Sequence, residues 1–274
     1  MNHNRPLNAI ELILLSAGLI GAVFGLSQTI SEIDMWLLLL FSALGFVWGI
    51  ISGGRRQSFF AHVAASLFFS VSALSLTLQN AWLPLIRIWL AFSEWLLRLF
   101  QGPIFTSPNT QSLALAGKSF IQSVSPLYYR FAIWIRQLVN GSPVYDPLVI
   151  VWVWTLLFTW ICIWAGWSNR RQQNSIYWLL PALLVTAGLS GYTQKSIVPL
   201  FFLLAALLLL TVYVSHLNRE RRWTAAQVDF STDVRLDIAL TSGFCVIILL
   251  VAAVLAPSFS YQDITRWWEK ITQP

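Results

Sequence analysis

Long runs of apolar residues, separated by short polar stretches, dominate the chain. About seven of these runs are long enough to cross a bilayer as helices, because roughly 20 apolar residues span its hydrocarbon core. They cover approximately residues 8–27, 35–52, 58–78, 148–167, 176–190, 197–215 and 238–256. The pattern predicts an all-α fold, a polytopic membrane helix bundle with about seven transmembrane helices.

Residues 85–100 form an apolar run that we do not expect to span the membrane. Their nine Leu, Ile and Phe residues favour insertion by roughly 3–5 kcal/mol, but Arg87, Glu94 and Arg98 each cost about 2.5–3.5 kcal/mol near the bilayer centre. The three charges share one helical face, and Trp89 and Phe92 lie on the opposite face. The segment is therefore predicted to be an amphipathic helix on the outer leaflet or over the bundle.

Further amphipathic helices are expected after this one. We predict two, over residues 112–124 and 127–139, divided at Pro126 because proline disrupts a helix interior. Arg130 and Arg136 occupy the polar arc of the second. Together with residues 85–100 they make residues 79–147 an extracytoplasmic amphipathic helical cap.

The whole chain, residues 1–274, is expected to be a single membrane domain. Residues 1–78 hold spans one to three, residues 148–257 hold spans four to seven, and residues 258–274 form an extracytoplasmic tail. Trp267 and Trp268 in that tail suit the outer membrane interface.

Basic residues cluster after every second span. These topology-setting residues are Arg55, Arg56, Arg170, Arg171, Arg219, Arg221 and Arg222. Short cytoplasmic loops are enriched in Lys and Arg, so the alternation supports the number of spans and predicts a cytoplasmic N-terminus and an extracytoplasmic C-terminus.

Composition supports the membrane assignment. The chain is 57% hydrophobic and only 10% charged, and it contains 15 Trp residues, which favour membrane interfaces. The net charge of +6 is accounted for by the basic clusters, so lipid bilayer is the expected partner and nucleic acid is not.

Candidate catalytic chemistry is sparse. Cys162 and Cys245 lie inside apolar runs and are interpreted as small buried residues. His62 and His216 are interpreted as interfacial residues, with a pair of ligands for a metal or haem as the alternative. Glu11 is expected near the interface, where it can reach water or a basic loop. We therefore expect no catalytic, cofactor-binding or metal-binding set in this chain.

Small residues recur at four-residue spacing in the first two spans. Gly21 and Gly25 form one such pair, and Gly45 and Gly49 form another. The pattern allows close helix approach, either within the bundle, which we favour, or in a dimer.

The stretch between the sixth and seventh spans carries a family resemblance. Physically, residues 219–223 are a basic turn with an interfacial Trp. The sequence then places Val228, Asp229, Phe230, Ser231, Arg235 and Asp237 in order. With Trp223, this order resembles the last cytoplasmic turn in the N-terminal membrane region of bacterial transglutaminase-like membrane proteins. The specific similarity covers about 40 residues, and the remainder resembles the family only in hydropathy.

The resemblance implies a bacterial inner-membrane module that precedes an extracytoplasmic transglutaminase-like domain. The catalytic Cys, His and Asp of such proteins lie in that outer domain, so no catalytic residue can be transferred to this chain. Our first hypothesis is a non-catalytic module that anchors or orients a transglutaminase-like or peptidase-like domain, in cis or as a partner. The alternatives are a permease or export subunit, or an outer-leaflet glycan- or lipid-processing protein with possible head-group contacts at Arg87, Arg98, Arg130 and Arg136.

Overall fold

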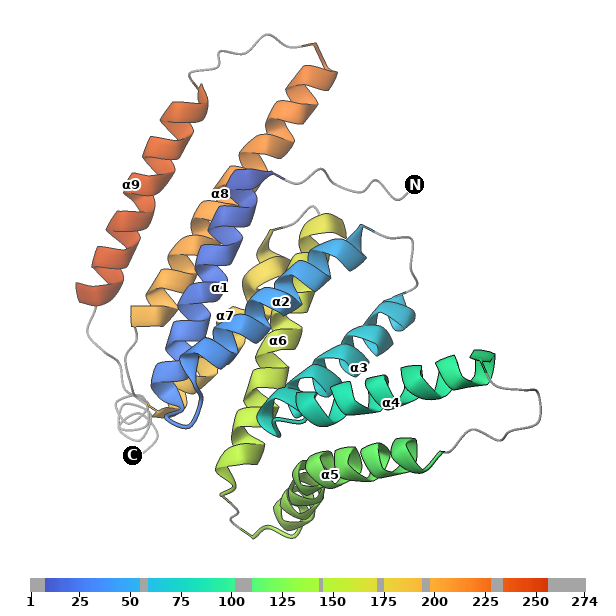
Figure 1. Ribbon diagram of the computed structural model, residues 1–274. Coiled ribbons are helices and arrows are strands. Elements are labelled where there is room, and N and C mark those ends of the chain that lie inside the picture. Colours follow the sequence, from blue (N-terminus) through green and yellow to red (C-terminus); the bar gives the residue numbers. More distant parts are fainter. Residues whose placement is uncertain are drawn as a thin grey trace, which may run out of the picture.

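The protein is a helical bundle, seen in a computed structural model that describes residues 8–54, 59–101, 110–142, 145–171, 175–193, 198–227 and 234–255 (Figure 1). These ranges contain helices and no strand, which confirms the predicted all-α class. The helices are α1 (Ala9–Thr29), α2 (Met35–Gly53), α3 (Phe59–Leu78), α4 (Trp82–Gln101), α5 (Gln111–Val139), α6 (Pro147–Arg171), α7 (Ile176–Thr193), α8 (Val198–Ala225) and α9 (Val234–Leu255).

Most of these helices are membrane-spanning by length and composition. Six of them, α1, α2, α3, α6, α7 and α8, are long and apolar enough to cross a membrane. This establishes a polytopic membrane protein surrounded by lipid. The seventh predicted span corresponds to α9, in which the described residues form only a shorter apolar stretch, Leu240–Leu249, so a seventh crossing stays a prediction.

The main apolar core lies between α1, α6, α7 and α8. Leu15 and Leu26 of α1, Phe158 of α6, Trp178 of α7 and Leu210 of α8 are all fully buried in it. α1 packs along α8, and α2 packs along α6. α3, α7 and α9 each pack against a member of these two pairs, which form the centre of the bundle.

Glycines set the close approach within both pairs. A Cβ atom on Gly21 would lie 2.6 Å from Phe202 of α8, and one on Gly49 would lie 2.2 Å from the carbonyl oxygen of Ile163 in α6. The small-residue motifs therefore pack inside the bundle, which confirms the interpretation favoured from the sequence over dimerisation.

Serine–tryptophan hydrogen bonds attach α3 to its neighbours. The indole N–H groups of Trp48 in α2, Trp160 in α6 and Trp152 in α6 donate to hydroxyl oxygens on α3. The acceptors are Ser66 at 3.0 Å, Ser70 at 3.0 Å and Ser75 at 3.2 Å, respectively. Indole N–H groups in hydrocarbon need such partners, so the serine spacing determines how α3 is oriented.

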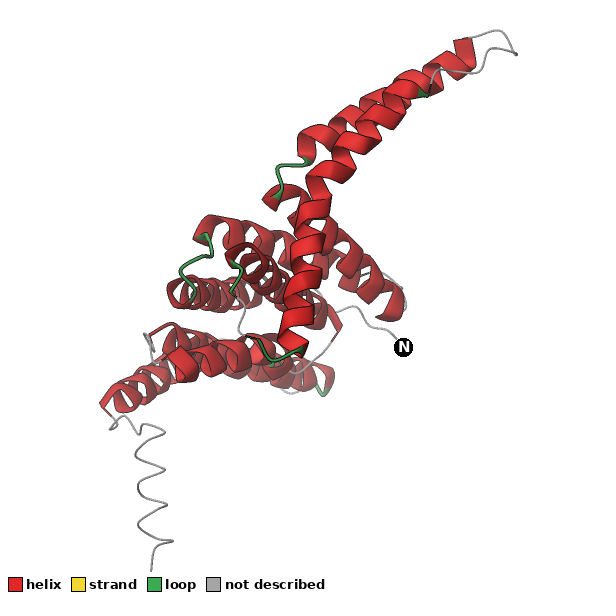
Figure 2. Ribbon diagram, turned by 90° about the horizontal axis from the view of Figure 1, so that it is seen from below, coloured by secondary structure: helices red, strands yellow, loops and turns green. Residues whose placement is uncertain are grey.

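α4 and α5 form a hairpin that leaves the bundle. Figure 1 shows α4 running crosswise to α6 beside its first half, with α5 next to α4 and near the end at which α6 begins, and Figure 2 shows a pair of long helices extending past the edge of the bundle. α4 packs mainly on α5, and α5 is fixed to the bundle where Leu127 contacts a cluster containing Leu74 and Trp152. The two helices occupy the region of the predicted cap, and its extracytoplasmic position stays a prediction.

The predicted division of the cap at Pro126 is wrong. α5 is one helix of 29 residues with Pro126 inside it. Proline removes one intrahelical hydrogen bond and bends a helix without necessarily ending it, and Figure 1 shows α5 changing direction along its length. The helices on both sides of the proline therefore belong to a single bent element.

The basic cluster after the sixth span is also not a turn. α8 runs for 28 residues, about 42 Å, and therefore exceeds the hydrocarbon core by several turns. Arg219, Arg221 and Arg222 project from this helical extension, and all three are exposed. Good helix-forming residues continue the helix where the sequence analysis expected a turn.

Candidate functional site

The described arginines predicted to set the topology lie at one end of the bundle. Figure 1 shows α2, α6 and α8 ending on the same side. We call this side the basic end, defined by Arg170 and Arg171 at the end of α6 and by Arg219, Arg221 and Arg222 on α8. Arg55 and Arg56 follow α2 directly but lie outside the described residues.

The predicted head-group arginines do not form a single cluster. Arg87 is exposed on α4, and Arg130 and Arg136 are exposed on α5. Arg130 and Arg136 are six residues apart, so they point about 120° away from each other around the helix. The side chain of Arg98 lies outside the described residues.

Arg130 instead contributes to the junction between α5 and α6. Its guanidinium lies 3.9 Å from the Asp146 carboxylate, which accepts hydrogen bonds from the backbone N–H groups of Leu148 and Val149 at 3.0 and 3.3 Å. Asp146 thus caps the N-terminus of α6, where a negative charge is favourable. With 54% of the Arg130 side chain exposed, this pair contributes mainly orientation.

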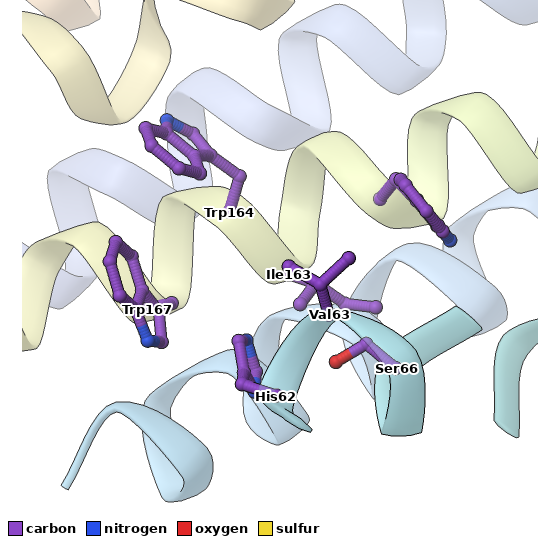
Figure 3. A pocket seen from close by; sticks show the side chains of 7 residues that line it. His62, Val63, Ser66, Ile163, Trp164 and Trp167 are labelled. Atoms are coloured by element: carbon purple, nitrogen blue, oxygen red, sulfur yellow. The ribbon is translucent and has the colours of Figure 1, made fainter. Parts of the chain in front are cut away.

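A hollow between α3 and α6 is the best-formed candidate site. It has a volume of about 270 Å³, and Figure 3 shows the side chains that line it. Its walls are lined by His62, Val63, Ser66, Trp160, Ile163, Trp164 and Trp167, and we call it the tryptophan hollow. A second hollow of about 200 Å³ lies further along α3 and shares Ser66 and Ile163.

Local sequence explains how the tryptophan hollow forms. Trp160, Trp164 and Trp167 are spaced by four and three residues, so they lie along one face of α6. The indole N–H of Trp160 donates to Ser70 of α3 at 3.0 Å, and that of Trp164 donates to the Tyr177 carbonyl of α7 at 2.9 Å. On the α3 side, Val63 and Ser66 line the hollow with short side chains. The number of tryptophans predicted only that they lie at the membrane interface. The helical spacing of these three is visible in the sequence and could have predicted that they share one face of α6.

His62 is the polar group inside the hollow. It is 5% exposed, and its ring stacks on Trp167 with a 6.0 Å centroid distance and an interplanar angle of 9°. Figure 3 shows it on α3, close to Trp167 of α6. The Nδ1 atom of His62 is buried and has no hydrogen-bond partner. His62 is therefore buried against Trp167, and its expected depth at the membrane interface stays a prediction.

Arg171 lies beside the same aromatic wall. Its guanidinium is 5.2 Å from the centre of the Trp167 ring, and its Nε–H donates to the Gly53 carbonyl at 3.4 Å. Arginine over a tryptophan face gains a cation–π attraction. His62, Trp167 and Arg171 thus form a polar margin on an otherwise apolar hollow at the basic end.

Other polar residues predicted at the interface are also buried. Glu11 is 1% exposed and His216 is 7% exposed. The expectation that Glu11 reaches water is wrong, because α1 packs against α7 and α8 on this side. Among the residues described, no group of three or more His, Cys, Asp or Glu side chains is placed to bind a metal ion.

The cysteines have different environments. Cys162 is buried in the core, as expected, whereas Cys245 is exposed on α9. Both thiols are free. The expectation that Cys245 is buried is wrong, since its side of α9 is not covered by α8.

Comparison of the chain with known protein families, with characterised proteins and with solved structures found no match. The resemblance to transglutaminase-like membrane proteins therefore remains a prediction based on residues 223–237.

Proposed function

We propose that this chain is a non-catalytic membrane module that anchors or orients an extracytoplasmic transglutaminase-like or peptidase-like domain, in cis or as a partner. The observation that supports this role is the α4–α5 hairpin, which lies crosswise near the end of the bundle opposite the arginines (Figure 1). A rigid bundle would fix the module in the bilayer, and the hairpin would give an outer domain a surface on which to rest.

The proposed location is a bacterial inner membrane, with the basic end in the cytoplasm. Clustered Arg residues at short loops are retained on the cytoplasmic side, so the positive-inside rule supports this orientation. The hairpin and the C-terminal tail would then both be extracytoplasmic. The tail, including Trp267 and Trp268, lies outside the described residues.

The orientation can be tested with single cysteines. In a background with Cys162→Ala and Cys245→Ala, cysteines are placed at Asn140, after α5, at Ala225, at the basic end, and at Pro274. A membrane-impermeant maleimide added to intact spheroplasts should label positions 140 and 274 but not position 225. Position 225 should become labelled once the membrane is opened. Protection of position 274 in intact spheroplasts would contradict the proposed role.

The anchoring role can be tested by site-specific crosslinking. A photoreactive phenylalanine analogue replaces exposed Leu90 or Leu97 of α4, and exposed Ile247 of α9 serves as the control position. Crosslinks from α4 to a domain that carries a Cys-His-Asp set, and none from α9, would support the proposal. Crosslinks from α4 to lipid alone would contradict it.

An outer-leaflet lipid-processing role is the second candidate, because the hairpin exposes large apolar side chains such as Trp89, which is 68% exposed. Replacing Arg87, Arg98, Arg130 and Arg136 with alanine should weaken the binding of anionic outer-leaflet lipid in this case. Unchanged lipid binding would remove the candidate. For a permease, the described hollows offer little support, because they are lined almost entirely by apolar groups.

A further inference from the structure

We propose that the tryptophan hollow binds one phospholipid with an anionic head group, its acyl chain lying between α3 and α6 and its phosphate beside His62 and Arg171. This inference does not depend on the anchoring role, because it concerns a different end of the molecule.

The position of the hollow suits a lipid. It extends from Trp160 to Trp167, a rise of about 10 Å along α6, and Arg171 lies one turn beyond. Arg171 ends α6 at the basic end, where the helix meets the head-group layer. The hollow therefore occupies the depth at which an acyl chain leaves the glycerol of a phospholipid.

The walls suit an acyl chain. Val63, Ile163 and the faces of the tryptophan rings present apolar carbon to the hollow, and the volume of about 270 Å³ is near the lower limit of typical ligand pockets. Because α3 and α6 are both apolar enough to cross a membrane, a chain that lies between them would enter from the bilayer without crossing water. A purely apolar groove in a membrane protein is filled by any mobile lipid. The polar margin formed by His62, Trp167 and Arg171 makes this hollow selective for the head group.

The polar margin suits a phosphate. His62 is 95% buried, since it is 5% exposed, and its Nδ1 has no partner within the protein. A buried ring nitrogen without a hydrogen bond is costly, and a phosphate oxygen would satisfy it. The Arg171 guanidinium stays near the same place through its contacts with Trp167 and Gly53, and arginine N–H groups match phosphate oxygens well.

Charge favours an anionic head group over a zwitterionic one. Arg170 and Arg171 both lie in the last turn of α6. Basic pockets between transmembrane helices are a recognised way of binding anionic lipids. A choline group would add its own positive charge close to the arginines. A glycerol head group has no charge, so the negative phosphate would be attracted to the arginines without opposition.

The test is native mass spectrometry of the full chain in detergent, titrated with phosphatidylglycerol or phosphatidylcholine carrying the same acyl chains. Phosphatidylglycerol is expected to bind about tenfold more tightly, because both lipids offer the phosphate and only phosphatidylcholine adds a positive charge beside the arginines. Glycerol 3-phosphate without acyl chains should not displace it. Equal affinity for the two lipids, or displacement by glycerol 3-phosphate, would overturn the proposal.

Variants separate the head-group and chain contacts. Arg171→Gln should reduce phosphatidylglycerol binding to the phosphatidylcholine level, and Arg171→Lys should restore part of it. Arg222→Gln makes the same charge change at the same end of the bundle but away from the hollow, and it should leave binding unchanged. An equal loss in both glutamine variants would indicate non-specific attraction and overturn the proposal.

A second variant guards against misfolding of Arg171→Gln. Val63→Trp fills the hollow without changing charge, and it should abolish binding of both lipids while circular dichroism shows unchanged helix content. Ile248→Trp, on the exposed side of α9, is its matched control and should bind as the unaltered chain does. Retained phosphatidylglycerol binding in a folded Val63→Trp variant would overturn the proposal.

Discussion

At the scale of single residues, backbone proximity governs the centre of the bundle. The Cβ positions of Gly49 in α2 and Gly166 in α6 would lie 2.2 Å and 2.4 Å from carbonyl oxygens of the opposite helix. Neither contact can be relieved by rotating a side chain, because the obstacle is backbone. The two helices therefore approach each other as closely as their main chains allow, and dispersion forces act along the whole contact.

Gly49→Ala is expected to destabilise the protein by about 1–3 kcal/mol, the usual cost of overpacking. Stability can be measured by unfolding in mixed micelles with increasing sodium dodecyl sulfate. Gly188→Ala in α7 is the control, because no atom lies within 4 Å of its added Cβ, and its stability should stay the same or rise slightly. Equal effects of the two substitutions would show that α2 and α6 are not in close contact.

Tyr145 gives a residue-level prediction about pH. It precedes α6, and its hydroxyl donates a hydrogen bond to Glu32 in the connection between α1 and α2. This bond, with a smaller contribution from burial and from the Glu32 charge, raises the pKa of Tyr145 above 10.0. The bond needs protonated tyrosine, so it is present below pH 10 and is lost as the pH rises through the raised pKa.

Glu32→Gln should therefore lower the pKa of Tyr145 towards 10.0. The pKa is read from the absorbance of tyrosinate, as the difference between each protein and the same protein carrying Tyr145→Phe. Glu94→Gln on α4 changes the same type of charge at a distance and should leave this titration unaltered. An unchanged tyrosine pKa in Glu32→Gln would mean that Tyr145 before α6 and Glu32 between α1 and α2 are not hydrogen-bonded to each other.

At the scale of elements, the apolar runs predicted the spanning helices well, because burial in lipid requires both length and low charge. The ends of α8 and the continuity of α5 could not be predicted in the same way. Arg219–Arg222 permits a helix as readily as a turn, and Pro126 either ends or bends a helix depending on what packs beside it. Here Leu127 and Phe131 pack near Trp152, and this contact keeps α5 continuous.

Pro126→Ala is expected to straighten α5, because it restores the missing backbone hydrogen bond. The distance between spin labels at Gln111 and Asn140, measured by pulsed electron resonance after replacing both native cysteines, should increase. Ser125→Ala, next to the proline, is the matched control and should leave the distance unchanged. A shorter or equal distance in Pro126→Ala would show that packing, and not proline, bends the helix.

At the scale of the whole molecule, the distribution of arginines defines a direction. The described basic clusters lie at one end, as the sequence predicted. Basic clusters follow every second span, and successive antiparallel spans end on opposite sides, so all the clusters come to lie on the same side. The tryptophan hollow could not be predicted from this pattern. It depends on the relative position of α3 and α6, which side-chain spacing on one helix does not determine.

Replacing Arg219, Arg221 and Arg222 together with glutamine should loosen the orientation of α8 and α9. A fraction of molecules should then expose a cysteine at Ala225 to impermeant maleimide in intact spheroplasts. Arg130→Gln with Arg136→Gln provides the control, because long extracytoplasmic segments count little in the positive-inside rule. Unchanged protection of position 225 in the triple variant would mean that apolar packing alone fixes the orientation.

The hydroxyl groups that attach α3 also have a spectroscopic consequence. Trp48, Trp152 and Trp160 donate to serines inside the bilayer, where hydroxide and water are scarce. Their indole protons should exchange with deuterium far more slowly than those of tryptophans at the aqueous interface, and they should appear as a small, persistent group in a proton–nitrogen spectrum. The movement of one helix relative to the rest could thus be followed without attaching any probe.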